Sequence, residues 1–103
     1  MAFLVVEQCV ADPQRWAGEF HAGDAARQAA GGRWAVLLAD PADEGRVTAI
    51  VAFDTAAQAH SWRERPGVEE QLACAGVDLA SVRVRVLEEI PPVPANDPRG
   101  SVS

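Results

Sequence analysis

The stretch that decides the fold is Arg46–Asp54, Arg-Val-Thr-Ala-Ile-Val-Ala-Phe-Asp. We interpret it as a central β-strand, in which successive side chains point to opposite faces of a sheet. The odd-numbered residues from 47 to 53 form one face and the even-numbered residues from 48 to 52 form the other. Neither face carries a charge, so we expect both to be covered. A layer of helices can cover one face. The chain is too short to supply a second sheet, so we expect a second copy of the chain to cover the other face.

Length and composition predict one soluble globular domain. The chain has 103 residues, of which 49% are hydrophobic and 23% are charged, and its net charge is −6. A net negative charge argues against nucleic-acid binding and against an anionic membrane surface. No apolar run approaches the roughly 20 residues of a membrane span. The apolar start of the chain ends at Glu7 and lacks the basic region of a signal peptide. We therefore expect a cytoplasmic protein.

Hydrophobic alternation and turn residues predict four strands and two helices. The strands are expected at residues 3–10, 33–40, 46–54 and 82–87, and the helices at 12–30 and 54–75. Asp12-Pro13 is a typical helix start, and Gly31-Gly32 a typical helix end. Pro66-Gly67 is expected to break or kink the second helix. The turn residues at 41–45 predict an antiparallel hairpin.

This order, β-α-β-β-α-β, predicts a ferredoxin-like α+β fold. In that topology a four-stranded antiparallel sheet carries both helices on one face. The strands at 3–10 and 46–54 are central, in agreement with their uniform apolarity. We expect the domain to span residues 1–90. Residues 91–103 are rich in proline and polar residues, and we expect them to form a flexible tail.

The chain also resembles the dimeric α+β barrel superfamily, within it the small antibiotic-biosynthesis monooxygenases and polyketide cyclases. The resemblance covers about residues 2–90 and rests on residues that fall at element ends and on inward faces. These are Asp12, Trp16, Phe20, Arg27, Gly31, the run Asp40–Val47, Phe53, Asp54, Ala59, Trp62 and Ala75-Gly76-Val77. The resemblance implies a homodimer in which two sheets pack face to face. It also implies a substrate cleft between helices and sheet.

Five aromatic side chains are expected to converge between the helices and the sheet. They are Trp16, Phe20, Trp34, Phe53 and Trp62. They predict either an aromatic-walled pocket for a flat apolar ligand or simply the core of a small domain. The core is the interpretation we favour, and the many alanines opposite the aromatic residues keep the pocket open as the alternative, because a core of tryptophan and alanine can enclose a void.

Polar residues near this cluster are candidates for chemistry. His21 follows Phe20 at the edge of the inward face, and a histidine suits general acid/base work near neutral pH. The alternative for His21, and for His60, is an exposed helix histidine. Arg27 is expected to bind an anionic or carbonyl group of a ligand, or to pair with a carboxylate at a helix end. Two histidines without a carboxylate cluster do not make a metal site, so we expect no metal. The resemblance implies that no cofactor is used.

The remaining polar residues have structural interpretations. Arg83 and Arg85 are expected to face the partner subunit, with Glu7 as their neighbour across two strands, in an ion-pair network or an anion site. Cys9 and Cys74 lack metal-ligand spacing, so we expect two buried, reduced thiols, with a disulfide or a reactive thiol as the alternative.

The resemblance implies a cofactor-independent monooxygenase or cyclase acting on an aromatic, polyketide-type substrate. Its monooxygenases use Asn, Trp and Tyr or Arg around the substrate, and a related haem-degrading branch uses Asn, Trp and His. This chain has no Tyr, and its one Asn is Asn96 in the tail. Trp16 and Trp62 remain as electron-rich partners for a substrate, and we take His21 and Trp62 as the catalytic candidates. The alternative is a non-catalytic ligand-binding or purely structural barrel protein.

Overall fold

The computed structural model describes residues 1–91. Strands and helices follow one another in the predicted order, with each helical region divided in two. They are β1 (Ala2–Val10), α1 (Pro13–Ala22), α2 (Asp24–Ala29), β2 (Gly32–Asp40), β3 (Asp43–Phe53), α3 (Ala56–Arg63), α4 (Val68–Cys74) and β4 (Val77–Glu88). The predicted tail lies outside the described residues, apart from Pro91.

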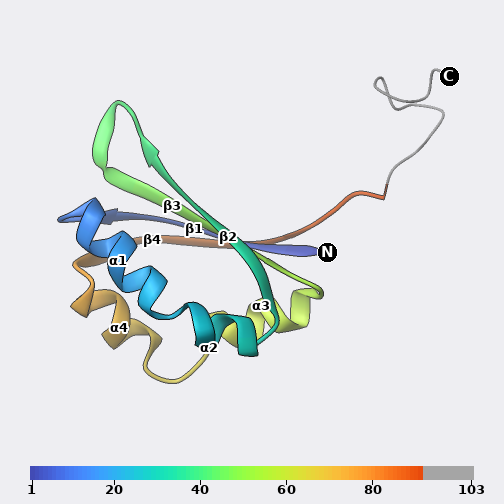
Figure 1. The fold of residues 1–103 in the computed structure, drawn as a ribbon. Coiled ribbons are helices and arrows are strands. Elements are labelled where there is room, and N and C mark those ends of the chain that lie inside the picture. The colour runs from blue at the N-terminus through green and yellow to red at the C-terminus, as the bar shows by residue number, and fades with distance from the viewer. Residues whose placement is uncertain (92–103) are drawn as a thin grey trace, which may run out of the picture.

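The four strands form one antiparallel sheet in the order β2-β3-β1-β4. The central strands are therefore β1 and β3, as predicted. All four helices lie on one side of the sheet, and no helix of residues 1–91 lies on the other side (Figure 1). Val5 of β1 pairs with Ile50 of β3, which in turn pairs with Val36 of β2. Cross-strand partners share a face of the sheet, so this register decides which side chains meet the helices.

The helices begin where the sequence indicates. The Asp12 side chain accepts hydrogen bonds from the backbone N–H groups of Gln14 and Arg15. Thr55 and Gln58 form a reciprocal capping box at the start of α3. The single helix predicted at 12–30 is wrong, because it breaks at Gly23 into α1 and α2.

The last strand begins five residues earlier than the predicted Val82. A register shift between β1 and β4 lies opposite Glu7 and Cys9, and it interrupts the alternation there. The Cys9 N–H donates to Ser81 Oγ at 2.8 Å, across the irregular segment. A bulge of this kind hides a strand from a search for strict alternation.

The face made by the odd-numbered residues of β3 is the buried one, as predicted. Val47, Ala49, Val51 and Phe53 are all buried beneath the helices. Phe53 is fully enclosed, and a side chain of this size contributes about 2–3 kcal/mol by burial. The helix-covered face therefore holds the core of the protomer.

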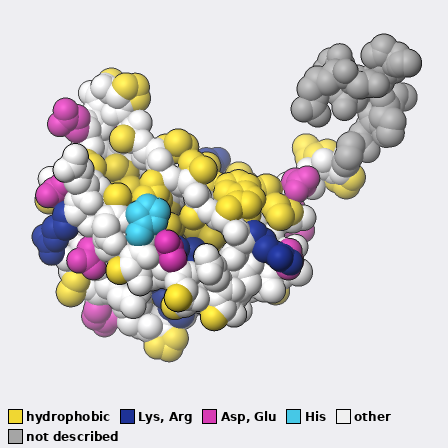
Figure 2. Space-filling view, in the orientation of Figure 1, with side chains coloured by type: hydrophobic (Ala, Val, Ile, Leu, Met, Phe, Trp, Pro, Cys, Tyr) yellow, Lys and Arg dark blue, Asp and Glu magenta, His cyan; other side chains and the backbone are white. Residues whose placement is uncertain are grey.

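The opposite face of the sheet, here called the open face, is apolar and uncovered within the protomer. Trp34, Val36, Leu38 and Leu87 are 48%, 40%, 49% and 43% exposed. Figure 2 shows hydrophobic side chains along the side of the sheet away from the helices. Trp34 was expected beside the helices, and that prediction is wrong. Its cross-strand partner is Ala52, an even-numbered residue of β3, and its ring contacts Phe3 at 5.7 Å between centroids.

The charged and thiol groups partly follow expectation. Glu7 and Arg83 are cross-strand partners on the open face, as predicted. Within residues 1–91 they form no ion pair, and Arg83 Nη1 instead donates to the carbonyl groups of Ala80 and Val82. Cys9 is only partly buried and Cys74 is exposed at the end of α4, so the prediction of two buried thiols is wrong.

Candidate functional site

A cleft of about 600 Å³ lies between the helices and the covered face of the sheet. Leu4, Val6, Ala49 and Val51 form its floor on β1 and β3. The helices contribute its walls, and most of the lining is apolar. This is a typical composition and size for a small-molecule site.

Three aromatic side chains wall the cleft. Trp16 and Phe20 lie one turn apart on α1, with ring centroids 6.1 Å apart and planes tilted by 46°. Trp62 comes from α3 and is half-buried. Trp16 is only 4% exposed, so it also belongs to the core. These aromatic residues thus form part of the core and also wall the cleft. The two interpretations from the sequence, a pocket and a core, are therefore compatible for them.

Arg27 lies inside this aromatic wall and is only 6% exposed. Its Nη1 donates to Asp24 Oδ1 and its Nη2 donates to the Phe20 carbonyl, both at 2.7 Å. The guanidinium carbon is 3.7 Å from the centroid of the Phe20 ring and 5.9 Å from that of Trp62. The helix break at Gly23 lets the Phe20 carbonyl accept this side-chain donor as well as the Gly23 N–H. The Arg27 Nε is buried and has no hydrogen-bond partner within residues 1–91.

Two further arginines line the cleft at the end of α3. Arg65 stacks on Trp62, with 3.8 Å between guanidinium carbon and ring centroid, and donates to the Trp62 carbonyl and to Gln71 Oε1. Arg63 is half-buried, and its Nε is enclosed without a partner among the described residues. Burial lowers the pKa of Arg65, and the charges of Arg27 and Arg63 lower it further.

Gln8 is a buried polar residue on the floor of the cleft. It belongs to β1, is 2% exposed, and its Oε1 has no hydrogen-bond partner within the described part of the chain. An unpaired buried amide oxygen costs free energy unless a ligand or water supplies a donor. The floor is thus apolar except for one acceptor.

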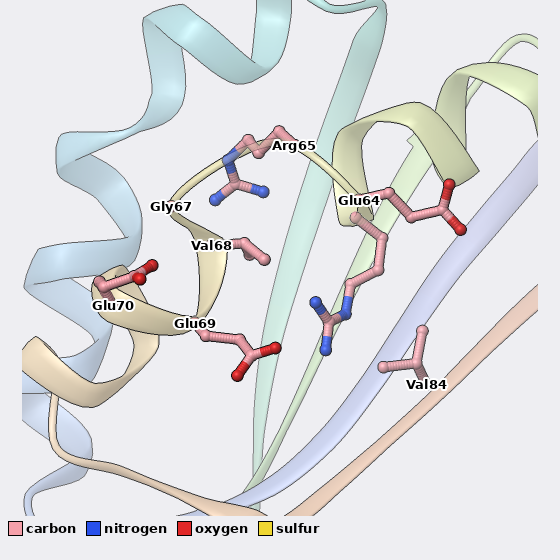
Figure 3. A pocket seen from close by; sticks show the side chains of 8 residues that line it. Glu64, Arg65, Gly67, Val68, Glu69, Glu70 and Val84 are labelled. Carbon is pink, nitrogen blue, oxygen red and sulfur yellow. The ribbon is translucent and has the colours of Figure 1, made fainter.

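A second hollow, of about 650 Å³, adjoins the cleft. It lies between β4 and the connection from α3 to α4, where Figure 3 shows Arg65, Gly67, Val68 and Glu69 on one side and Val84 on the other. Both hollows are lined by Arg63, Arg65, Val68 and Glu70. We call this shared rim the mouth of the cleft.

Solved structures of similar fold cover most of the chain. A protein from Deinococcus radiodurans that is named as an antibiotic biosynthesis monooxygenase is 17% identical to this chain. Its TM-score is 0.65, and the match covers 90% of this chain and 96% of the Deinococcus chain. SnoaB, a cofactor-independent oxygenase from Streptomyces nogalater, is 15% identical, with a TM-score of 0.64 over the same shares. The chain has the antibiotic biosynthesis monooxygenase fold. No protein-family model matches it, and no curated protein matches it significantly.

Four of the predicted site residues line the cleft: Trp16, Phe20, Arg27 and Trp62. Phe53 does not, because it is sealed in the core. Trp34 and His21 instead border a small hollow of about 120 Å³ beyond α2. The His21 side chain is 62% exposed, and its Nδ1 lies 3.4 Å from Asp24 Oδ2. The expected convergence of the aromatic set is therefore wrong for Trp34. Phe53 packs with Phe20 and Trp62 as core, which is one of the two interpretations the sequence left open, and His21 is the exposed histidine of its alternative.

The sequence interpretation missed three polar residues of the cleft, Gln8, Arg63 and Arg65. Gln8 had a signal, because it is a polar residue at an inward position of an apolar strand. The two arginines flank Glu64 just before Pro66-Gly67, and such charges normally indicate a solvated loop. Within residues 1–91 no cluster of three or more metal-ligating side chains occurs, and no helix is long and apolar enough to cross a membrane.

Proposed function

We propose that this protein is a homodimeric cofactor-independent monooxygenase whose substrate is a flat aromatic, polyketide-type molecule. One observation carries the proposal: an apolar cleft of about 600 Å³ with three aromatic walls, in a chain with the fold of SnoaB. A fused ring system fills such a cleft by stacking and by burial of apolar surface.

In this proposal Trp16, Phe20 and Trp62 hold the ring, and Arg27, which donates to Asp24 and to the Phe20 carbonyl, holds the Phe20 wall in place. Trp62 is the residue we place in direct contact with the reacting ring, since it is half-buried and lines the cleft. We do not place His21 in contact with the ring, because its side chain points to solvent and pairs with Asp24. Any proton transfer is then made by a group other than His21.

The reaction we assign is oxidation of an anthrone-type CH2 group by O2. The carbon loses two hydrogens and gains a carbonyl oxygen, and the second oxygen atom leaves as water. The substrate supplies all the electrons, so the balance requires no external reductant. Holding the electron-rich ring in a dry, oriented site is the contribution expected of the protein.

The dimer belongs to the same proposal and is supported by the open face. A monomer rarely exposes a contiguous apolar surface of this kind, and a second sheet laid on it buries Trp34, Val36 and Leu38. Glu7 and Arg83 lie on the same face and offer opposite charges to a symmetric partner. The occupant we assign is a second copy of the chain.

A specific observation favours one alternative, a ligand-binding protein without catalysis. None of the described residues that line the cleft is Asn, Tyr or His. A binding protein needs only the apolar walls and the arginines, and these are present.

Oxygen uptake with an anthrone separates the two functions. The proposal predicts uptake above the uncatalysed rate, one O2 per quinone formed, and a large loss in a Trp62→Ala variant. Native mass spectrometry of the same sample shows whether the anthrone is bound. Bound anthrone without uptake above the Trp62→Ala rate contradicts the oxygenase and leaves the binding protein.

A further inference from the structure

The inside of the cleft is more basic than an uncharged aromatic ligand requires. Arg27, Arg63 and Arg65 all line it, in a chain whose net charge is −6. The carboxylates of the same lining, Glu19 and Glu70, belong to exposed residues. The charged groups that are buried or half-buried are therefore all arginines.

The three arginines differ in how their charge is balanced. Arg27 has an ion pair with Asp24. Within residues 1–91 Arg65 bonds only neutral partners, the Trp62 carbonyl and Gln71. Arg63 has no ion pair and no hydrogen bond within the described residues, although Glu64, Glu69 and Glu70 border the same hollow. Two guanidinium groups at the mouth thus lack a counter-charge.

Such an arrangement is unfavourable in the empty protein. Partial burial strips water from a charge, and neighbouring like charges repel one another. Arg63 and Arg65 lie on either side of Glu64, and both border the two hollows at their shared mouth. An oxyanion relieves both costs, because it supplies the missing counter-charge and accepts hydrogen bonds from the guanidinium groups; a carboxylate can bind one guanidinium fork with both oxygens.

We infer that the ligand carries an oxyanion, a carboxylate or an ionised phenol, which Arg63 and Arg65 bind at the mouth while the ring stacks on Trp62 and Phe20. This inference rests on the proposed binding of an aromatic ligand, and it adds the charge of that ligand and the residues that select it. Arg63 is the main selecting residue because none of its donors is used by the protein itself within residues 1–91. Arg27 is a positioning residue for the Phe20 wall.

The test compares three probes of the same ring: anthracene-2-carboxylate, the neutral 2-(hydroxymethyl)anthracene, and 2-hydroxyanthracene. Binding is followed by fluorescence at neutral pH in full-length protein. We expect the carboxylate to bind at least about tenfold more tightly than the alcohol, as a charge-assisted bond predicts. For 2-hydroxyanthracene, the absorbance of the bound phenol shows whether the site selects a phenolate or a carboxylate. A lowered phenol pKa on binding indicates a phenolate site, and an unchanged one indicates a carboxylate site.

Arg63→Gln is the decisive variant, and Arg46→Gln is its control, because Arg46 is exposed on the β2–β3 hairpin away from the cleft. Arg63→Gln should reduce the carboxylate preference to less than about threefold and leave the affinity for the alcohol almost unchanged. Arg46→Gln should keep the preference.

Equal binding of the carboxylate and the alcohol by the wild type overturns the inference and leaves the proposed aromatic site intact. Binding of neither probe overturns both. Thermal unfolding of Arg63→Gln gives a separate check, since loss of an uncompensated charge should leave the melting temperature unchanged or raise it. A large fall would show that Arg63 serves the fold, and would also overturn the inference.

Discussion

The two faces of the sheet are built from the same kinds of residue but have different surroundings. Val51 of β3 lies under the helices and is buried, whereas Val36 of the neighbouring strand lies on the open face and is 40% exposed. The covered face gains a core and, where the aromatic walls leave space, a cleft. The open face is not covered by any described part of the protomer, and its apolar side chains stay exposed.

This difference shows that apolar alternation identifies faces that need burial without saying what buries them. On the covered face the helices cover most of the sheet, and three arginines line the cleft that is left between them and the strands. On the open face the charges are few, and the apolar surface is continuous from Trp34 to Leu38 along β2. We therefore assign ligand binding to one face and self-association to the other, and the following changes test that division.

The largest expected effect comes from a charge placed on the open face. Val36→Glu should convert the proposed dimer to monomer at micromolar concentration, because burying an unpaired carboxylate in an interface costs several kcal/mol. Light scattering measures the change. Val84→Glu is the matched control, since Val84 is similarly exposed but lies on the helix side of the sheet. A dimer that survives Val36→Glu would refute the assignment of the open face.

The next effect concerns the buried arginine of the covered face. Arg27→Met should lower the free energy of unfolding by about 2 kcal/mol, because the Phe20 carbonyl loses its side-chain donor and the α1–α2 junction loses packing. Urea unfolding at fixed protein concentration measures it. Gln14→Met, at an exposed position of α1, should change stability by less than about 0.5 kcal/mol. Equal effects of the two variants would mean that Arg27 does not hold the junction.

Two tryptophans on opposite faces give a third contrast. Trp62→Ala should weaken binding of anthracene-2-carboxylate at least about tenfold, through loss of a stacking surface, and leave the dimer intact. Trp34→Ala should weaken the dimer and leave ligand binding nearly unchanged. Fluorescence titration and light scattering on both variants measure the two properties. A reversed pattern would show that the roles of the faces had been exchanged.

The smallest expected effect is on acid stability. Hydrogen bonds from Arg33 hold the pKa of Asp54 below its ordinary value. Since the folded pKa is the lower one, the pair stabilises the fold above about pH 4 and loses this contribution as pH falls further. Asp54→Asn should therefore show a shallower loss of stability in acid than the wild type. Identical acid unfolding curves would mean that this exposed pair contributes nothing measurable.

The sequence predicted the fold well because the signals were local. Helix caps at Asp12 and Thr55, the Pro66-Gly67 break and the apolar central strands each depend on a few neighbouring residues. The side of the sheet on which Trp34 lies depends on its pairing with Ala52 across the hairpin. This register is a contact between two strands, and the sequence pattern of one strand does not determine it.

The site was predicted only in part. Trp16, Phe20, Arg27 and Trp62 were found because they lie on inward helix faces. Arg63 and Arg65 were missed, because their position in the cleft depends on how the chain turns between α3 and α4. Phe53 was expected in the site because it is aromatic and inward, but close packing encloses it completely.

The central claim, that one face binds ligand and the other binds a second copy, is tested most directly by native mass spectrometry of the wild-type protein with anthracene-2-carboxylate. The account predicts a dimer that carries two ligands, and a Val36→Glu monomer that still carries one. A wild-type monomer at micromolar concentration, or a dimer that carries no ligand at saturating probe, would contradict it.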